Sequence, residues 1–258
     1  MNIIRIPTDP YAYIEVEFDG TPEETLKEYE RLFKLYNNKD DVVWEKVETF
    51  TGETILYDKA GHNYKDLNGN KLYGGSSYKK LIEKNPFDTE KMSKLTAKKH
   101  DTTDTLIKEM WSGTSVVSSA FGTALHLAME HYFKHRNHGT DKNYHIPKHP
   151  FLKKAVLSFE YANSNLTTLP ERFVSDVANK RVGQIDLLVG GDFGYIIVDY
   201  KTDAEIEKKL QSHFHQMSYY AHILMAKGHK VTTLEVWNYT DKWEVYDSEV
   251  LPLESHQP

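Results

Sequence analysis

The chain has 258 residues, of which 39 % are hydrophobic and 27 % charged, and its formal net charge is −6 at pH 7. This length allows one sizeable core, and the acidic balance argues against a protein that simply coats nucleic acid. The absence of cysteine excludes disulfides, thiolate zinc sites and cysteine nucleophiles. No apolar run approaches the roughly 18 residues of a membrane span, and the N-terminus is too short for a signal peptide. We therefore expect a soluble cytoplasmic protein without a membrane segment.

Residues 1–40 predict a small acidic β-α appendage. A strand is expected from Tyr11 to Phe18, and Thr21-Pro-Glu-Glu is expected to cap a helix that runs to about Tyr36. Residues 1–48 contain twelve acidic and six basic side chains. This segment is expected either to dock a partner, such as a replication or recombination protein, or simply to pack on the core.

Residues 41–258 predict a single further domain. Short alternating runs from Trp44 to Tyr73 indicate strands, with Asn68-Gly69 as a hairpin turn, and a short helix is expected over Tyr78 to Lys84. Residues 71–100 hold eight lysines against three acidic residues. This basic stretch fits either a phosphate-binding surface or a solvated helix face.

The second half of the chain predicts a mixed sheet with helices on its faces, an α/β (α+β) fold. Helices are expected over residues 104–110, 115–136, 150–162 and 210–227, with Gly113 between the first two. Strands are expected over residues 171–177, 182–189, 195–200, 231–239 and 243–250. Hairpin-connected strands followed by a helical crossover indicate both antiparallel and parallel pairing.

The stretch from Gly183 to Thr202 reads as two apolar strands joined by a Gly-Gly-Asp-Phe-Gly turn. Each strand carries one carboxylate, Asp186 and Asp199. Because strand side chains alternate, Asp199 and Lys201 point the same way and Tyr200 points opposite. Asp199 and Lys201 alone also fit a structural ion pair. A second carboxylate within hairpin range favours a site for Mg²⁺, because two nearby carboxylates repel unless a cation lies between them.

Two helices offer supporting side chains. On the long helix, Gly122, His126 and Glu130 recur every four residues and share one stripe, with Glu130 able to orient His126. On the later helix, Gln216 and Tyr220 are also four apart. An imidazole binds Mn²⁺ better than Mg²⁺, and an amide with a phenol can hold a phosphate or orient the lysine. Each of these side chains also fits ordinary core packing.

Four motifs, taken in this order, resemble the PD-(D/E)XK nuclease superfamily and, within it, the RecB-type exonuclease-like branch. The motifs are Gly122-Thr-Ala-Leu-His126, Gly183-Gln-Ile-Asp186, Asp199-Tyr-Lys201-Thr and Gln216-Met-Ser-Tyr-Tyr220. The resemblance covers about residues 111–240. It implies a restriction-endonuclease-like core in the order αβββαβ, which is the order of the elements expected above.

The resemblance also implies roles for individual residues. His126, Asp186, Asp199 and the backbone carbonyl of Tyr200 would bind one or two Mg²⁺ or Mn²⁺ ions. Lys201 would position the attacking water or stabilise developing charge. The remaining implied catalytic residues are Gln216 and Tyr220, which would support the site and contact the DNA backbone, and Glu171, which falls where many relatives carry an acidic residue. Some relatives hold an iron–sulfur cluster, which a chain without cysteine is not expected to bind.

The implied function is metal-dependent hydrolysis of phosphodiester bonds in DNA. We expect an exonuclease of DNA processing, recombination or repair, acting on linear, end-containing or single-stranded DNA in a bacterial or phage-infected cell. Two alternatives stay open. One is a structure-specific endonuclease of the same fold, and the other is a catalytically silent DNA-binding or partner-docking scaffold. Loss of the metal or lysine positions would favour the scaffold, and none of these positions is missing.

Overall fold

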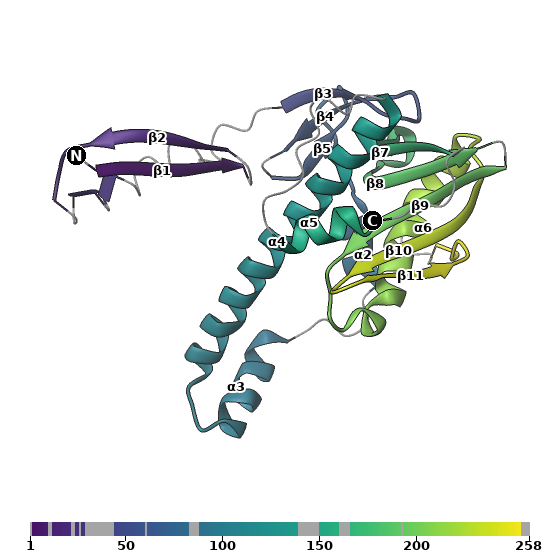
Figure 1. Cartoon of the computed structure of the whole chain (residues 1–258). Coiled ribbons are helices and arrows are strands. Elements are labelled where there is room, and N and C mark those ends of the chain that lie inside the picture. The colour runs from purple at the N-terminus through teal and green to yellow at the C-terminus, as the bar shows by residue number, and fades with distance from the viewer. Residues whose placement is uncertain are drawn as a thin grey trace. The chain divides into compact units, whose positions relative to one another are not determined.

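The computed structural model describes residues 2–9, 12–21, 24–25, 27–28, 44–59, 61–82, 88–138, 150–159, 166–191 and 193–253 (Figure 1). The chain divides into two compact units. The first comprises residues 1–45 with 57–63, and the second comprises residues 46–56 with 64–258. Among the described residues, no helix is both long and apolar enough to cross a membrane.

The N-terminal residues form an antiparallel pair of strands, β1 (Asn2–Asp9) and β2 (Ala12–Phe18). β2 corresponds to the expected strand, whereas β1 was not predicted. Thr21 caps the start of a helix as expected, because its hydroxyl accepts the Glu24 N–H and its own N–H donates to the Glu24 carboxylate. Most of the helix expected to reach Tyr36 lies outside the described residues.

Four short strands form a second sheet in the order β3-β4-β5-β6. They are β3 (Trp44–Glu48), β4 (Thr54–Asp58), β5 (Asn63–Lys65) and β6 (Lys71–Leu72). The predicted hairpin turn at Asn68-Gly69 joins β5 to β6, with Gly69 at a φ of +84° that favours glycine. The carboxylate of Asp66 accepts the backbone N–H groups of Asn68 and Asn70 and so holds this turn.

Five helices follow in the described part of the chain: α2 (Gly75–Ile82), α3 (Thr89–Lys99), α4 (Asp104–His138), α5 (Pro150–Leu157) and α6 (Leu210–Ala226). α3 was not predicted. The two helices expected on either side of Gly113 are one helix, α4, so the predicted break was wrong. α5 ends earlier than expected, and the polar segment 139–149 lies outside the described residues.

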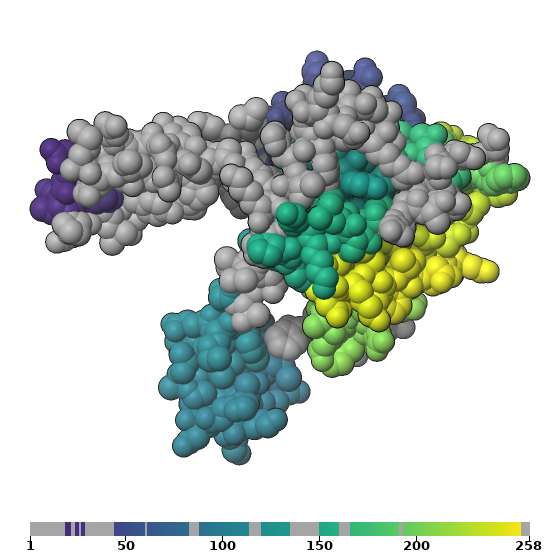
Figure 2. Space-filling model, in the orientation of Figure 1, coloured from purple at the N-terminus to yellow at the C-terminus, as the bar shows by residue number. Residues whose placement is uncertain are grey.

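The first helices of the larger unit expose apolar side chains. Leu95 on α3 is 54 % exposed, and Leu106 and Met110 on the first turns of α4 are similarly open. This surface is blue to teal in Figure 2. The buried face of α3 is limited to Ser93 and Ala97. The sequence therefore has no periodic pattern of apolar residues from which this helix could be predicted.

The main sheet has five strands in the order β11-β10-β9-β8-β7. They are β7 (Thr167–Asp176), β8 (Arg181–Gly191), β9 (Gly194–Lys201), β10 (Val231–Tyr239) and β11 (Trp243–Ser248). β9 and β10 are parallel and the other neighbours are antiparallel, so the predicted mixed sheet is confirmed. β7 begins before Pro170, which is tolerated there because β7 is an edge strand of this sheet.

Helices cover both faces of this sheet (Figure 1). α4 and α5 pack on one face through a cluster that includes Leu125, Met129 and Phe133. α6 packs on the other face, joined by Tyr78 of α2, which stacks on Tyr219 with ring centroids 5.0 Å apart. The helix–sheet–helix arrangement expected from the sequence is therefore confirmed, and it places α4 and α6 on opposite sides of β8 and β9.

Candidate active site

Asp186 lies where the side-chain alternation of β8 reverses. Leu187 and Val189 pack in the cluster with α4, whereas Ile185 and Leu188 both pack in the cluster with α6. Two residues three positions apart share a face only if the regular pleat is interrupted between them. Asp186 therefore occupies an irregular position in an otherwise apolar strand.

Glu171 on β7 is the counterpart of this irregularity. Pro170 pairs with Leu187 and Arg172 with Ile185, so the register sets Glu171 opposite Asp186. The φ of Glu171 is +50°, a conformation that is strained for a residue with a Cβ. A shared distortion of the two strands thus brings two carboxylates together.

β8 and β9 separate next to Asp186, where their pairing within the main sheet ends. Their ladder ends at the pair Leu187–Val198, and beyond it the Tyr200 N–H donates to Asp186 Oδ2 at 3.0 Å. β9 continues alongside β10 as far as Lys201. A small pocket opens at the split, and its lining includes both Asp186 and Asp199.

Asp199 and Lys201 extend from the end of β9 on the same side, as the alternation predicted. Lys201 Nζ lies 2.6 Å from Asp199 Oδ2 and donates to the carbonyl of Tyr200 at 3.0 Å. The Tyr200 ring points the other way and is buried in the cluster with α4. Asp199 and Lys201 are mostly buried, with side chains 19 % and 24 % exposed.

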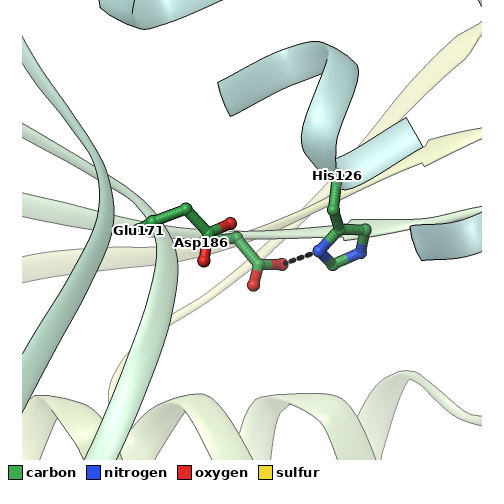
Figure 3. A group of neighbouring side chains, drawn as sticks. All are labelled: His126, Glu171 and Asp186. Carbon is green, nitrogen blue, oxygen red and sulfur yellow. Dashed lines mark ion pairs between the residues drawn. The ribbon is translucent and has the colours of Figure 1, made fainter. Parts of the chain in front are cut away.

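His126 reaches this group from α4. Its Nε2 is 2.9 Å from the carbonyl oxygen of Tyr200. Its Nδ1 is 3.4 Å from Asp186 Oδ2, the pair that Figure 3 marks. Both ring nitrogens thus face the strand ends. Glu130 instead pairs with Lys134 one turn further along α4, so the prediction that Glu130 orients His126 was wrong.

Glu171 completes a cluster of possible ligands. One ligand atom each from His126, Glu171 and Asp186 lies within 4.8 Å of the others (Figure 3). The Glu171 carboxylate also accepts a hydrogen bond from Gln184 Nε2 at 2.6 Å. Sequence reasoning gave Gln184 no role, although its place two residues before Asp186 could have suggested one.

α6 brings Gln216 and Tyr220 to the pocket from the opposite face. Gln216 Nε2 donates to the Tyr220 hydroxyl at 3.0 Å, and both residues line the pocket with Asp186 and Asp199. The ring of Tyr220 fits only because β8 carries glycine at 183. A Cβ at Gly183 would lie 2.2 Å from Tyr220 Cε1.

Burial and charge together shift the pKa values of the carboxylates. Burial opposes ionisation of Asp186, but His126 and Lys201 outweigh it and hold the pKa of this carboxyl well below its usual range. Burial dominates at Asp199 and raises its pKa, with partial compensation from Lys201. Burial and the charge of Asp186 raise the pKa of Glu171 to about 8. At neutral pH, Asp186 is thus the firmly ionised carboxylate.

The two cations of the cluster are stabilised by these carboxylates. Burial disfavours the charged form of His126, but Asp186 more than compensates and raises its pKa to about 9. Lys201 is likewise buried, and Asp199 and Asp186 keep its pKa above the ordinary value. A charged His126 beside an ionised Asp186 is the arrangement that a divalent cation would replace.

His213 is a further site residue whose role sequence reasoning missed. It lies in the first turn of α6, it is 8 % exposed, and its Nδ1 is 3.8 Å from Asp199 Oδ2. Burial, followed by the charge of Lys201, lowers its pKa to about 3, so the ring is neutral. A histidine three residues before Gln216 shares its helical stripe, and this spacing was the available signal.

The residues present fit a divalent cation. Carboxylates and a backbone carbonyl are hard oxygen donors of the kind that Mg²⁺ and Mn²⁺ accept, and an imidazole suits Mn²⁺. His126, Asp186 and the Tyr200 carbonyl lie together, with Glu171 beside them. Asp199 stands at the edge of the group, where Lys201 holds it. Its assignment as a ligand stays a prediction.

Comparison with known proteins identifies the family. The family model of the PD-(D/E)XK nuclease superfamily matches residues 97–255. This match covers more than half of the chain, and the chain belongs to the PD-(D/E)XK nuclease superfamily. No curated protein matches it.

Membership implies nuclease activity, with DNA as the substrate, and nucleases of this superfamily use divalent metal ions. The mixed five-stranded sheet with helices on both faces agrees with the restriction-endonuclease-like fold of the superfamily. The RecB-type branch and the exonuclease activity stay predictions.

Proposed function

We propose that the protein is a divalent-metal-dependent deoxyribonuclease that digests DNA from an end. The observation that carries this proposal is the convergence of Asp186, Asp199, Lys201 and His126 around the carbonyl of Tyr200. Two carboxylates, a lysine and an imidazole with mostly buried side chains are a costly combination unless they act on a charged ligand.

His126, Asp186, Asp199 and the Tyr200 carbonyl would hold Mg²⁺ or Mn²⁺, with Glu171 close enough to bind directly or through water. When bound, such an ion polarises a phosphoryl oxygen and lowers the pKa of a coordinated water. One oxygen of Asp186, Oδ2, both receives the Tyr200 N–H and lies near His126, which supports this role by fixing the carboxylate beside the imidazole.

Lys201 would position the attacking water in line with the leaving group and stabilise the negative charge that develops on the phosphoryl oxygens. Its ammonium is held between Asp199 and the Tyr200 carbonyl, so it is fixed at the strand end. Gln216 and Tyr220 would support the site and contact the DNA backbone, since both residues line the pocket that Asp186 and Asp199 also line.

Digestion from an end, rather than internal cutting, rests on the resemblance to RecB-type exonucleases through His126 and the Gln216–Tyr220 pair. We propose a role in DNA processing, recombination or repair in the cytoplasm of a bacterial or phage-infected cell. Residues 1–40 would then serve as a docking segment for a replication or recombination protein.

The test is a cleavage assay with Mg²⁺ or Mn²⁺ on end-labelled linear DNA beside closed circular DNA. We expect loss of the linear substrate alone, and a rate reduced about 10²- to 10³-fold in Lys201→Ala. Lys208→Ala is the matched control, because Lys208 is an exposed lysine paired only with Glu205 among the described residues. Cutting of the circle would favour an endonuclease. Binding of DNA without any cleavage would favour a silent scaffold.

A further inference from the structure

His213 is a buried polar side chain without a hydrogen bond in the described structure. The residue is 8 % exposed, and neither ring nitrogen has a hydrogen-bond partner among the described residues. An unsatisfied buried polar group costs about 1–3 kcal/mol, so a histidine at such a place calls for an explanation.

The surroundings of His213 indicate the role of this side chain. His213, Gln216 and Tyr220 follow one stripe of α6, the stripe that faces the split between β8 and β9. Asp199 Oδ2 lies within ion-pair distance of its ring, 3.8 Å from Nδ1. This separation exceeds a hydrogen bond but closes with a small movement of the carboxylate.

The two site carboxylates differ in how they are held. Asp186 receives a backbone N–H, that of Tyr200. Asp199 is held by Lys201, and among the described residues Lys201 and His213 are the basic side chains within ion-pair distance of it. If Lys201 acts on the attacking water, Asp199 needs another donor, because carboxylates that bind a metal are oriented by hydrogen bonds from neighbouring groups.

We propose that His213 is a positioning residue for Asp199, whose Nδ1–H donates to this carboxylate when it acts as a metal ligand and so leaves Lys201 free for the water. The inference rests on the proposed metal-dependent function. An imidazole suits this task because its ring nitrogen can supply the N–H that the carboxylate accepts.

Calorimetric titration of the full chain with Mn²⁺, without DNA, tests the inference. His213→Leu should bind Mn²⁺ about tenfold more weakly than the wild type. His213→Asn, whose amide nitrogen can replace Nδ1–H, should stay close to wild-type affinity. His215→Leu is the matched control on the same helix, because the side chain of His215 pairs with Gln211.

Stability supplies a second readout. Without metal, the melting temperature of His213→Leu should equal or exceed that of the wild type, since the substitution removes an unsatisfied polar group. A purely structural histidine would show the reverse pattern, with stability lost and Mn²⁺ affinity kept. If His213→Leu fails to fold, His213→Asn is compared with His213→Gln, whose longer amide reaches the place of Nε2. Equal affinities of these two variants would overturn the inference.

The outcomes separate this inference from the proposed function. Unchanged Mn²⁺ affinity in His213→Leu, beside weakened binding in Asp199→Asn, would overturn the role of His213 and leave the metal site intact. No Mn²⁺ binding by the wild-type chain would overturn the proposed metal-dependent function together with the inference that rests on it.

Discussion

At the scale of single residues, the site depends on local departures from regular structure. Asp186 and Asp199 were expected to meet because their strands form a hairpin, and they do line one pocket. The reversed pleat at Asp186 could not be predicted, because it depends on the positive φ of Glu171 on another strand. Sequence reasoning thus found the charged groups but not the distortion that collects them.

The buried His213 makes stability depend on pH. Its pKa is about 3 in the folded chain against an ordinary 6.5, so the unfolded chain binds more protons between these values. The contribution of the neutral ring is therefore complete above pH 6.5 and is lost as the pH falls toward 3. At pH 5 the loss amounts to about 2 kcal/mol.

Urea denaturation at pH 7 and pH 5 in a metal chelator measures this effect. The free energy of unfolding should fall by about 2 kcal/mol more in the wild type than in His213→Leu. Parallel losses in the two proteins would mean that His213 is protonated in the folded state.

At the scale of elements, the packing of α6 against β8 requires a position without a side chain on β8. Gly183 lies under the ring of Tyr220, and a Cβ there would come within 2.2 Å of it. Gly183→Ala should destabilise the chain by about 1–3 kcal/mol and lower cleavage, because Tyr220 must move away from Gln216. Thermal unfolding and the linear-DNA assay measure the two effects, and unaltered values in both would contradict the packing described.

Replacing Gly113 in α4 by alanine is expected to stabilise the chain, in contrast to the replacement of Gly183. A Cβ there meets no atom within 4 Å, and the residue is exposed in the middle of a helix. Gly113→Ala should therefore stabilise the chain by about 0.5–1 kcal/mol. If a break separated two helices at this point, as the sequence suggested, the gain in melting temperature would be absent.

The success of the sequence-based predictions differed between elements for physical reasons. The strands of the main sheet and α6 were found because their buried residues recur with a clear period. α3 was missed because it buries only two small side chains. The apparent break in α4 came from weighing one glycine above the packing that holds the helix together.

At the scale of the whole molecule, the nuclease core extends beyond the part that the family model matches. The match begins at residue 97, yet Tyr78 of α2 stacks on Tyr219, and the Tyr219 hydroxyl donates to the carbonyl of Tyr73 at 2.5 Å. Gly75 also leaves space for Tyr220, because a Cβ at Gly75 would lie 2.7 Å from this ring. Residues upstream of the match therefore support α6 and its site residues.

Truncation tests this extension. A fragment of residues 41–258 should unfold cooperatively and cleave DNA like the full chain. A fragment of residues 97–258 should not, because it loses the aromatic stack and the hydrogen bond that hold Tyr219. Full activity of the shorter fragment would show that α2 and the strands before it are dispensable.

We propose that Asp186 and Asp199 together hold the metal ion needed for cleavage. The most direct measurement compares the rate of linear-DNA cleavage across a range of Mg²⁺ concentrations in the wild type, Asp186→Asn and Asp199→Asn, with DNA binding measured in parallel. We predict that both variants bind DNA and that neither cleaves it, because an amide is a weaker metal ligand than a carboxylate. Unchanged turnover of both variants at limiting Mg²⁺ would contradict the site described.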